Sequence, residues 1–546
     1  MNDEGAAGMN DEDAAGMNDD HELLVVGSGI AGCAAALGAA REGSEVLLVT
    51  KAERPEDAAT DWAQGGIATS RGDPESLKKD IVDASDGTAD EEAVGVLVSE
   101  ADSAVRDVLV ETLDVPFDGD HADSGDDSFD YAREAAHSEE RILHVDASTG
   151  EHVLRPFLNY LDGHEQVHIL DDTAALDLIT HEGRVYGAVL DRTPDGEPAP
   201  AGERVYADTT ILATGGIGSC YGRSTNPEGA TGDGIAMAAL AGADVADMEF
   251  VQFHPTAYAP PEDEVADSDG DSFLDSDGDS FLVSEAVRGA GATLENGEGE
   301  RFMPEYHEDA ELAPRDVVAR AVARERERTG KVVLDVSGFD FRAEFPDLAV
   351  LCDDAGVDLP EIPVAPTQHF LCGGIDVDLS GRASLDRLYA VGECARTGVH
   401  GANRLGSTSL LEGLVWGLRA GADAASVADT DSGTVEAPEL LDRDPALPDR
   451  FAAEKFVRLQ RIMDEHVGLR RSPDGLRRAG AVLRRLKGEV DAYVRTRTSR
   501  SLYELRNAAV TALLVTRAAA DNPNSLGCHY VVEDGDELAE TEATAD

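Results

Sequence analysis

Lysine is scarce in this sequence, with six residues among the 45 basic ones, and 110 acidic residues bring the formal net charge to −65. So acidic a surface repels nucleic acid and anionic membranes, which excludes functions that depend on binding either. Charge-driven disorder is also excluded, because 42% of the residues are hydrophobic. The charge instead favours a halophilic protein, since concentrated salt screens its self-repulsion.

Cysteine is also sparse, with six residues and no C-x-x-C pair. The sequence therefore shows neither a zinc site nor an iron–sulfur ligand set, and we expect no bound metal. Scattered cysteines and an N-terminus without a basic signal region predict a cytoplasmic protein. One uncharged run, residues 23–40, is nominally long enough to cross a bilayer, but it is rich in glycine and alanine.

Two stretches repeat short acidic units, at residues 1–20 and at residues 267–282, where D-S-D-G-D-S-F-L occurs twice. The second repeat opens like an EF-hand loop but lacks the glycine at position six and the glutamate at position twelve. A solvated acidic loop is therefore favoured. A non-enzymatic, acidic calcium-binding protein stays open as a remote alternative.

A dinucleotide-binding motif follows the first repeat. An apolar strand, a glycine-rich turn, a helix and a second strand are predicted in order, with Gly27, Gly29 and Gly32 in the spacing G-x-G-x-x-G. This pattern explains the uncharged run better than a membrane span does. The acid that normally follows the second strand is displaced, because Lys51 stands there and Glu53 comes late. The motif alone does not separate NAD from FAD.

Two later segments favour FAD. One hydrophobic strand runs into A-T-G-G at residues 213–216, and another ends in G-E-C, which contains Glu393. Glycine-rich strand ends that lie far apart in sequence indicate one extended cofactor contacted repeatedly. A second G-x-G-x-x-G, expected for a separately bound nicotinamide, is absent.

Residues 400–417 place Arg404 just before a predicted amphipathic helix. Ser409 and Glu412 form an S-x-x-E capping box, which predicts that the helix begins there. A helix N-terminus and a nearby arginine both favour anions. Beyond residue 450, the apolar periodicity predicts three further helices.

Nine stretches share an order and spacing that identify a family resemblance. They are D-W-A-Q-G-G-I-A, R-E-A-A-H-S-E-E-R-I-L-H, S-T-N-P-E-G-A-T-G-D-G-I-A-M-A, M-E-F-V-Q-F-H-P-T, S-E-A-V-R-G-A-G-A, R-F-M-P-E-Y, L-A-P-R-D-V-V-A-R-A, Q-H-F-L-C-G-G-I and the stretch at 400–417. From about residue 22 to residue 520, the chain resembles the succinate dehydrogenase/fumarate reductase flavoprotein superfamily, and within it most closely the L-aspartate oxidase family.

The resemblance implies an α/β architecture: a split, Rossmann-like FAD-binding domain with an inserted α+β capping domain and a C-terminal helical bundle. An acidic, disordered N-terminus and an acidic tail are expected at the two ends. The expected boundaries are 1–20 for the N-terminus, 21–249 and 366–427 for the FAD-binding domain, 250–365 for the capping domain, 428–449 for a linker, 450–525 for the three-helix domain and 526–546 for the tail.

The resemblance also implies a reaction, in which FAD oxidises L-aspartate to iminoaspartate. The electrons then pass either to O2, which becomes hydrogen peroxide, or to fumarate. This reaction would open de novo NAD biosynthesis, with a possible hand-off of the imine to quinolinate synthase. FAD is expected to be non-covalent, because Ala59 replaces the histidine that links the flavin in succinate dehydrogenases. A fumarate reductase or succinate dehydrogenase flavoprotein subunit stays open as the alternative. The expected cofactor-binding residues are Gly27, Ser28, Gly29, Ile30, Ala31, Gly32, Lys51, Thr60, Ala63, Gln64, Gly65, Gly66, Asp233, Glu393, Ser409 and Leu410.

The same family motifs imply the catalytic and substrate-binding residues. Arg315 matches the proton-transfer arginine of the family, and Glu134 should pair with the α-ammonium group that succinate lacks. Two departures from the family pattern stand out: Ala135 and Ala136 replace glycines in R-E-G-G-H-S, and N-S-L-G-C-H-Y replaces S-R-G-L-H-Y. The two substrate carboxylates are expected to be held by Arg404 with His369 at one end, and by His254, Ser284, Glu285 and the donor Gln252 at the other.

Overall fold

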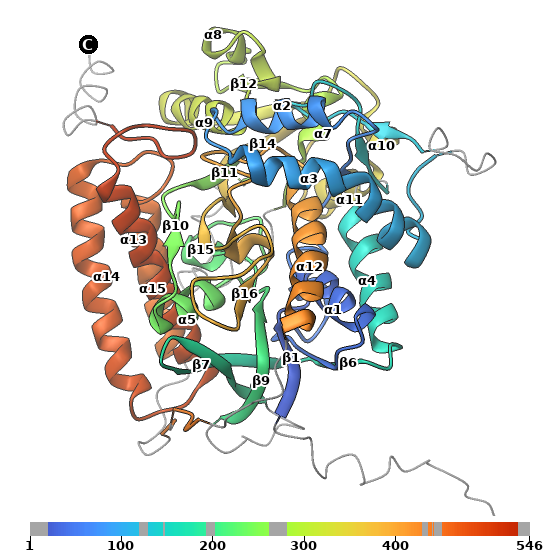
Figure 1. Cartoon of the computed structure of the whole chain (residues 1–546). Helices are drawn as coiled ribbons and strands as arrows, with labels where there is room; N and C mark the ends of the chain where they lie inside the picture. Colours follow the sequence, from blue (N-terminus) through green and yellow to red (C-terminus); the bar gives the residue numbers. More distant parts are fainter. Residues whose placement is uncertain are drawn as a thin grey trace, which may run out of the picture.

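The computed structural model describes residues 20–119, 129–145, 148–192, 202–260, 281–427, 435–438, 440–441 and 450–532. Figure 1 shows one sheet at the bottom, a second sheet with its helices at the top and long C-terminal helices at the left. The repeat at 1–20 lies outside the described residues except for residue 20. The repeat at 267–282 does so except for Phe281 and Leu282.

Within the described residues, the larger sheet has seven strands. Its order is β6 (Val167–Leu170), β2 (Val46–Val49), β1 (Asp20–Val26), β9 (Glu203–Leu212), β8 (Arg184–Arg192) and β7 (Thr173–His181), with β16 (Leu388–Ala390) also paired to β9. The pairs β6–β2, β2–β1, β1–β9 and β9–β16 are parallel, whereas β7, β8 and β9 pair antiparallel. The carboxyl ends of the parallel strands therefore meet at one edge, where open α/β sheets bind their ligands.

Two helices pack closely on this sheet: α1 (Ile30–Arg41) and α12 (Thr408–Val427). A Cβ atom at Gly417 would collide with the Ala31 carbonyl oxygen, and one at Gly421 would collide with that of Ala35. Small residues are therefore required for the two backbones to approach. This packing, rather than a membrane, accounts for the uncharged run at residues 23–40, which becomes β1 and α1.

The start of α12 differs from the sequence expectation. The helix begins at Thr408, so Ser409 lies inside its first turn. The Ser409 hydroxyl accepts a hydrogen bond from Nη1 of Arg404 at 2.8 Å, and the Glu412 carboxylate accepts one from the Thr397 hydroxyl at 2.9 Å. The predicted capping box is wrong, because the helix begins before Ser409 and other side chains bind the Ser409 hydroxyl and the Glu412 carboxylate.

A second, antiparallel sheet stands above the first (Figure 1). Its strand order is β11 (Val251–Tyr258), β14 (Glu361–Leu371), β13 (Val332–Asp335) and β12 (Thr293–Asn296). The helices of this region are α7 (Glu285–Gly289), α8 (Met303–Tyr306), α9 (Arg315–Thr329), α10 (Phe341–Glu344) and α11 (Pro346–Asp354). Every residue of β11 is buried, including Gln252 and His254. Polar side chains in such a strand need partners in the interior, which ties β11 to a site.

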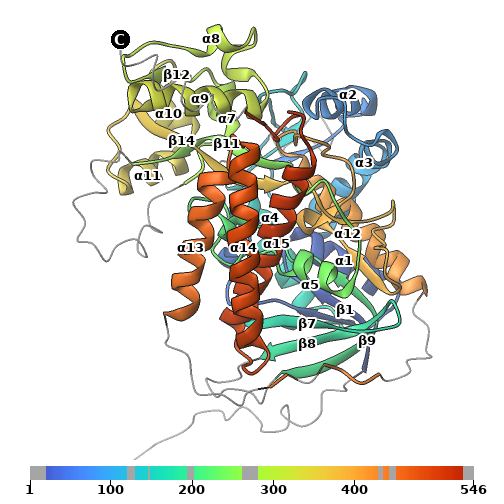
Figure 2. The ribbon, with the colours of Figure 1, turned by 90° about the vertical axis from the view of Figure 1, so that its left-hand side faces the viewer.

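The C-terminal region contains α13 (Phe451–His466), α14 (Pro473–Val494) and α15 (Arg500–Asp521). Leu476, Leu483, Leu486 and Val490 line the buried face of α14, as the periodicity predicts. Figure 2 shows α15 alongside α5 (Asp233–Ala241), above β7 and β8. The predicted helical C-terminal region is confirmed. In the described part of the chain, no helix is long and apolar enough to span a membrane.

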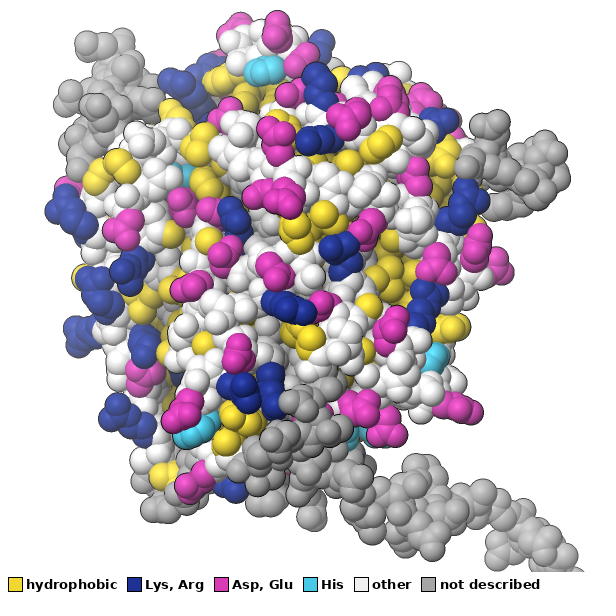
Figure 3. All heavy atoms as spheres, in the orientation of Figure 1, with side chains coloured by type: hydrophobic (Ala, Val, Ile, Leu, Met, Phe, Trp, Pro, Cys, Tyr) yellow, Lys and Arg dark blue, Asp and Glu magenta, His cyan; other side chains and the backbone are white. Residues whose placement is uncertain are grey.

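The described chain contains further helices and short strands. On the face shown in Figure 3, acidic and basic side chains are intermixed, and basic side chains gather along α14 at the left. The basic side chains are therefore unevenly distributed over this face. The further helices are α2 (Pro74–Ala84), α3 (Glu91–Ala104), the π-helix η2 (Val105–Thr112) and α4 (Thr149–Asp162). The short strands are β3 (Ile67–Ala68), β4 (Tyr131–Ala132), β5 (Ile142–Leu143), β10 (Val245–Ala246), β15 (Gly374–Asp376) and β17 (Ala395–Arg396).

Candidate functional site

The glycine-rich turn between β1 and α1 forms a backbone cradle. Gly27 adopts φ +113°, and a Cβ atom there would collide with the Ala213 carbonyl group. Gly29 is the N-cap of α1 and, having no side chain, leaves the helix end open. A Cβ atom at Gly32 would collide with the Gly27 carbonyl oxygen. The turn therefore presents the N-terminus of α1 at the carboxyl edge of the sheet, an arrangement that binds phosphate groups.

The segment at residues 60–66 continues this cradle. The Thr60 hydroxyl accepts a hydrogen bond from the backbone N–H of Ile30 at 3.1 Å. The Gln64 side-chain oxygen is buried, with no hydrogen-bond partner among the described residues. Gly65 lies directly against the Glu134 carboxylate, where a Cβ atom would not fit. This segment thus joins the helix end to the buried cluster around Glu134.

Glu393 lies where two strand ends converge. Its carboxylate accepts a hydrogen bond from the Leu371 backbone N–H at 2.9 Å, and it packs against Gly216 of the A-T-G-G turn. Burial raises the pKa of Glu393 to about 7. Ser28, in the glycine-rich turn, donates a hydrogen bond to Thr50 at 2.9 Å.

These observations test whether the residues fit FAD. The N-cap Gly29 places no side chain over the end of α1, which suits a pyrophosphate. Gly27 and Gly32 allow the tight turn that presents this helix end, because a Cβ atom at either position would collide with a backbone carbonyl group. The buried, unpaired oxygen of Gln64 offers an acceptor to a ligand. The expected residues that the fold brings to this edge are Gly27, Ser28, Gly29, Ile30, Ala31, Gly32, Lys51, Thr60, Ala63, Gln64, Gly65, Gly66, Asp233 and Glu393, with Ser409 and Leu410 in the first turn of α12.

Arg404 is buried at the start of α12, with 6% of its surface exposed. Its Nη2 lies 3.2 Å from Nε2 of His369, and its guanidinium stacks 4.5 Å from the centroid of the Phe370 ring. Burial and the nearby Arg315 lower the pKa of Arg404 to about 9. Its Nε has no partner within the described chain, which leaves a buried donor for a ligand.

The two histidines belong to neighbouring strands. His254 on β11 and His369 on β14 have ring centroids 5.2 Å apart. Burial, together with the charges of Arg315 and Arg404, lowers the pKa of both rings well below the usual value. Both imidazoles are therefore neutral near pH 7. The sequence assigns them to opposite ends of the substrate, whereas the structure places them side by side in one cluster.

Arg315 begins α9 and is held by two partners. Its Nη1 donates to the Gln252 side-chain oxygen at 2.8 Å, and its Nη2 donates to Glu285 at 2.7 Å. The other Glu285 oxygen accepts from Arg288 at 2.7 Å. Burial opposes ionisation of Glu285, but the two arginines outweigh it and lower its pKa to about 2. The adjacent Ser284 is buried at the N-cap of α7.

Glu134 completes the cluster from the opposite side. Its Oε2 accepts a hydrogen bond from the Ser407 hydroxyl at 2.8 Å. Burial, with the negative charge of Glu285, raises the pKa of Glu134 to about 7. Gly406 lies between these groups, because a Cβ atom there would press against the Glu134 and Glu285 carboxylates and Arg315. The fold therefore brings Glu134, Glu285 and Arg315 from three separate motifs to Gly406, which belongs to a fourth.

The sequence analysis did not identify several residues that surround this cluster. Asn403 is hydrogen-bonded to Gln252 at 2.9 Å and to Asp316 at 3.1 Å, so it links α9, β11 and the segment before α12. A ring nitrogen of His137 lies 3.1 Å from the Gly406 carbonyl oxygen. Asn403 stands beside Arg404 and His137 stands three residues after Glu134, so a search of the motif neighbours would have found them. Arg288, Gly406 and Ser407 were missed in the same way.

The fold and this site define an FAD-dependent flavoprotein. The family described as an FAD binding domain matches residues 22–410. An L-aspartate oxidase of Halobacterium salinarum is 66% identical over 524 residues, covering 96% of this chain and 98% of that protein. An L-aspartate oxidase of Streptomyces coelicolor is 38% identical and covers 93% of this chain and 88% of its own length. The chain therefore belongs to the L-aspartate oxidase family of FAD-binding proteins.

Solved structures agree with this assignment at the level of the fold. A variant of the E. coli quinol fumarate reductase FrdA has a TM-score of 0.80 and 27% identity, and the match covers 94% of this chain and 92% of that one. Mycobacterium smegmatis Sdh1 has a TM-score of 0.77 and 28% identity over 94% and 88% of the two chains. The predicted fold class and the FAD cofactor are confirmed. The fumarate reductase alternative is not favoured, because the sequence relatives at 66% and 38% identity are L-aspartate oxidases.

Proposed function

We propose that this protein oxidises L-aspartate to iminoaspartate with bound FAD and passes the electrons to O2, which becomes hydrogen peroxide, or to fumarate. The observation that carries the proposal is the buried cluster around Gly406. It combines arginines, neutral histidines and a carboxylate whose pKa is about 7. A small dicarboxylate that carries an amine has a matching group for each of them.

The cationic side of the cluster binds the substrate carboxylates. Arg404 offers a planar guanidinium with an unpaired Nε, which suits bidentate contact with a carboxylate. His254 has a buried, unpaired Nε2, and His369 lies against Arg404. Glu285 does not bind a carboxylate directly, because it is ionised and already paired with Arg315 and Arg288. Its role is to hold Arg315 in position.

Glu134 recognises the α-ammonium group. A carboxylate fixed by the Ser407 hydroxyl attracts an ammonium group, whereas succinate offers it no partner. Oxidation at the amine releases protons, and a group with a pKa of about 7 is suited to accept one near neutral pH. We therefore assign both amine recognition and proton uptake to this carboxylate.

Arg315 serves the second half-reaction when fumarate is the electron acceptor. Burial opposes its charged form, but Glu285 outweighs this effect and raises the pKa of Arg315. A charged Arg315 has a proton to donate, which the reduction of fumarate requires. Gln252 and Glu285 fix the direction of that guanidinium.

FAD, when bound, supplies the acceptor for the hydride that leaves C2 of the substrate. The glycine-rich turn and the open end of α1 would hold its pyrophosphate, and residues 60–66 would line its path toward the cluster. The first turn of α12, with Ser409 and Leu410, would present backbone N–H groups to it. We propose non-covalent binding because Ala59 stands at the histidine position.

Anaerobic mixing tests the function. The purified yellow protein is mixed separately with L-aspartate, D-aspartate and succinate, and the loss of flavin absorbance is followed. L-Aspartate should bleach the flavin fastest. Rapid bleaching by succinate alone would overturn the assignment. Release of free FAD on acid denaturation tests the non-covalent link, and reoxidation by air or by fumarate identifies the electron acceptor.

The place of this reaction in metabolism forms part of the proposal. The L-aspartate oxidase resemblance supports the first step of de novo NAD biosynthesis in the cytoplasm, with iminoaspartate passed to quinolinate synthase. Iminoaspartate hydrolyses in water, so a consuming enzyme must act quickly. A reagent that traps the free imine distinguishes direct transfer from release into solution. It should leave quinolinate formation unchanged if the two proteins transfer the imine directly, and lower it if the imine is released.

A further inference from the structure

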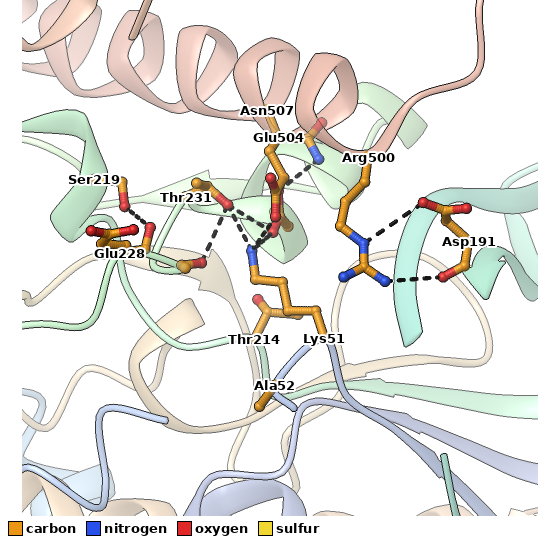
Figure 4. A network of polar contacts seen from close by, with 12 residues as sticks. Lys51, Ala52, Asp191, Thr214, Ser219, Glu228, Thr231, Arg500, Glu504 and Asn507 are labelled. Atoms are coloured by element: carbon orange, nitrogen blue, oxygen red, sulfur yellow. Dashed lines mark hydrogen bonds and ion pairs between the residues drawn. The ribbon is translucent and has the colours of Figure 1, made fainter. Parts of the chain in front are cut away.

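Lys51 follows β2 at the position where dinucleotide-binding folds place an acid for the ribose hydroxyls. Its Nζ lies 2.5 Å from Oδ2 of Asp233, 2.9 Å from the Thr231 hydroxyl and 3.2 Å from Oε1 of Glu504. Figure 4 shows Lys51 pointing between Thr231 and Glu504. Lys51 thus stands where the acid is expected and pairs with two carboxylates from distant elements, Asp233 of α5 and Glu504 of α15.

Helix α15 supplies half of this arrangement. Glu504 contacts Lys51, and one turn further on Asn507 donates a hydrogen bond to Oδ1 of Asp233 at 2.9 Å. The Asn507 oxygen in turn accepts from Arg506 at 3.1 Å, which fixes the amide orientation. Both oxygens of Asp233 are therefore engaged, one by Lys51 and Thr231 and the other by α15.

The network connects directly to the cofactor cradle. Thr50, next to Lys51, accepts the hydrogen bond from Ser28 of the glycine-rich turn. Asp233 begins α5, and the N–H of the next residue, Gly234, donates to the Thr214 hydroxyl of the A-T-G-G turn at 3.1 Å. A displacement of Lys51 or Asp233 would therefore reach both glycine-rich turns.

We propose that Glu504 and Asn507 are positioning residues for FAD, which hold Lys51 and Asp233 at the ribose end of the cofactor site. The C-terminal helical region then contributes to cofactor affinity, although Lys51 lies 453 residues before Glu504 in the chain. This inference rests on FAD as the cofactor and is independent of the identity of the substrate. Two carboxylates on one ammonium keep Lys51 charged, because they outweigh the burial that would otherwise lower its pKa.

The test compares three variants of α15. Glu504→Gln and Asn507→Leu each remove one contact to the Lys51–Asp233 pair. Arg500→Gln is the matched control, because Arg500 ties the same helix to Asp172 at 2.6 Å and faces Asp191 but does not contact the pair (Figure 4). The dissociation constant of FAD is measured by serial dilution of the holoprotein, with the recovery of flavin fluorescence as the readout.

We expect Glu504→Gln and Asn507→Leu each to raise the dissociation constant of FAD about tenfold, the effect of losing one charge-assisted hydrogen bond. Arg500→Gln should lower the unfolding temperature and leave the FAD dissociation constant within about twofold. Adding Lys51→Gln to Glu504→Gln should cost less than the sum of the single effects, because both disrupt one interaction.

Unchanged FAD affinity in both test variants would overturn the inference. So would an Arg500→Gln variant that loses as much affinity as Glu504→Gln, because the effect would then be general to the helix. A wild-type protein that binds no FAD would overturn the cofactor assignment itself, and this inference with it.

Discussion

The polar network around Lys51 and the polar cluster around Arg404 differ in how completely their atoms are paired. In the first, Lys51 has three partners and both oxygens of Asp233 accept hydrogen bonds. In the second, Nε of Arg404 and Nε2 of His254 are buried and have no partner in the described structure. Buried polar atoms without partners cost free energy, so the second arrangement is built for a ligand and the first to support one.

The strongest test of this contrast is Arg404→Leu. Removing the guanidinium should reduce turnover of L-aspartate about a thousandfold, the scale of losing a charged group that binds and polarises the reacting molecule. Flavin absorbance should persist, because the cradle around Gly27 is untouched. Arg404→Lys, measured in parallel, should recover only a small part, since an ammonium group lacks the planar fork. Normal turnover in Arg404→Leu would refute the carboxylate clamp.

Gly406→Ala tests the geometry of the cluster without removing any polar group. The added methyl would press against the Glu134 and Glu285 carboxylates, and the displacement should lower kcat/KM about a hundredfold. Gly488→Ala, in α14, is the matched control, because a Cβ atom there meets nothing within 4 Å. Equal activity in the two variants would show that the cluster tolerates this displacement and is not the reaction site.

The pH dependence of kcat/KM tests the role of Glu134 in the cluster around Arg404. Glu134, with its raised pKa of about 7, is neutral below that pH and loses its attraction for the ammonium group. The kcat/KM for L-aspartate should therefore fall about tenfold per unit as the pH drops below about 7. Glu393 has a similar pKa, so Glu134→Gln is needed to identify the group: this variant should flatten that limb of the profile. A profile unchanged in Glu134→Gln would assign the limb to another residue.

The smallest expected effect concerns the backbone beside Glu134. Ala136 adopts φ +67°, a left-handed conformation that favours glycine. Ala136→Gly should raise the free energy of unfolding by about 0.5 kcal/mol, since relief of strain exceeds the added entropy of the unfolded chain. The neighbouring Ala135→Gly should lower it by about 1 kcal/mol, because Ala135 lies outside the left-handed region and glycine there only adds entropy to the unfolded chain. Thermal or denaturant unfolding measures both changes.

Much of the fold could be predicted because its signals are local. Gly27, Gly29 and Gly32 follow the G-x-G-x-x-G spacing of one turn, and the face of α14 follows from its own periodicity. The candidate site was predicted mainly through family motifs, which placed Arg404, Arg315 and Glu134. Their shared neighbour Gly406 carried no separate signal.

The capping box at Ser409 and Glu412 was predicted wrongly because the pattern does not show which other side chains bind these two residues. Ser409 and Glu412 fit the capping pattern, but Arg404 and Thr397 bind their side chains instead. The S-x-x-E pattern records the spacing of two residues, and it does not record which other side chains compete for them.

The dinucleotide turn, the helical C-terminal region and the residue types of the candidate site could be read from the amino-acid order alone, because helix periodicity, glycine conformation and motif spacing act over a few residues. The three-dimensional packing was needed to show that His254 and His369 share one cluster, that Glu285 is bound between two arginines and that α15 reaches Lys51. Burial and ion pairing set the charge of each of these groups, and both depend on which distant segments the fold packs together.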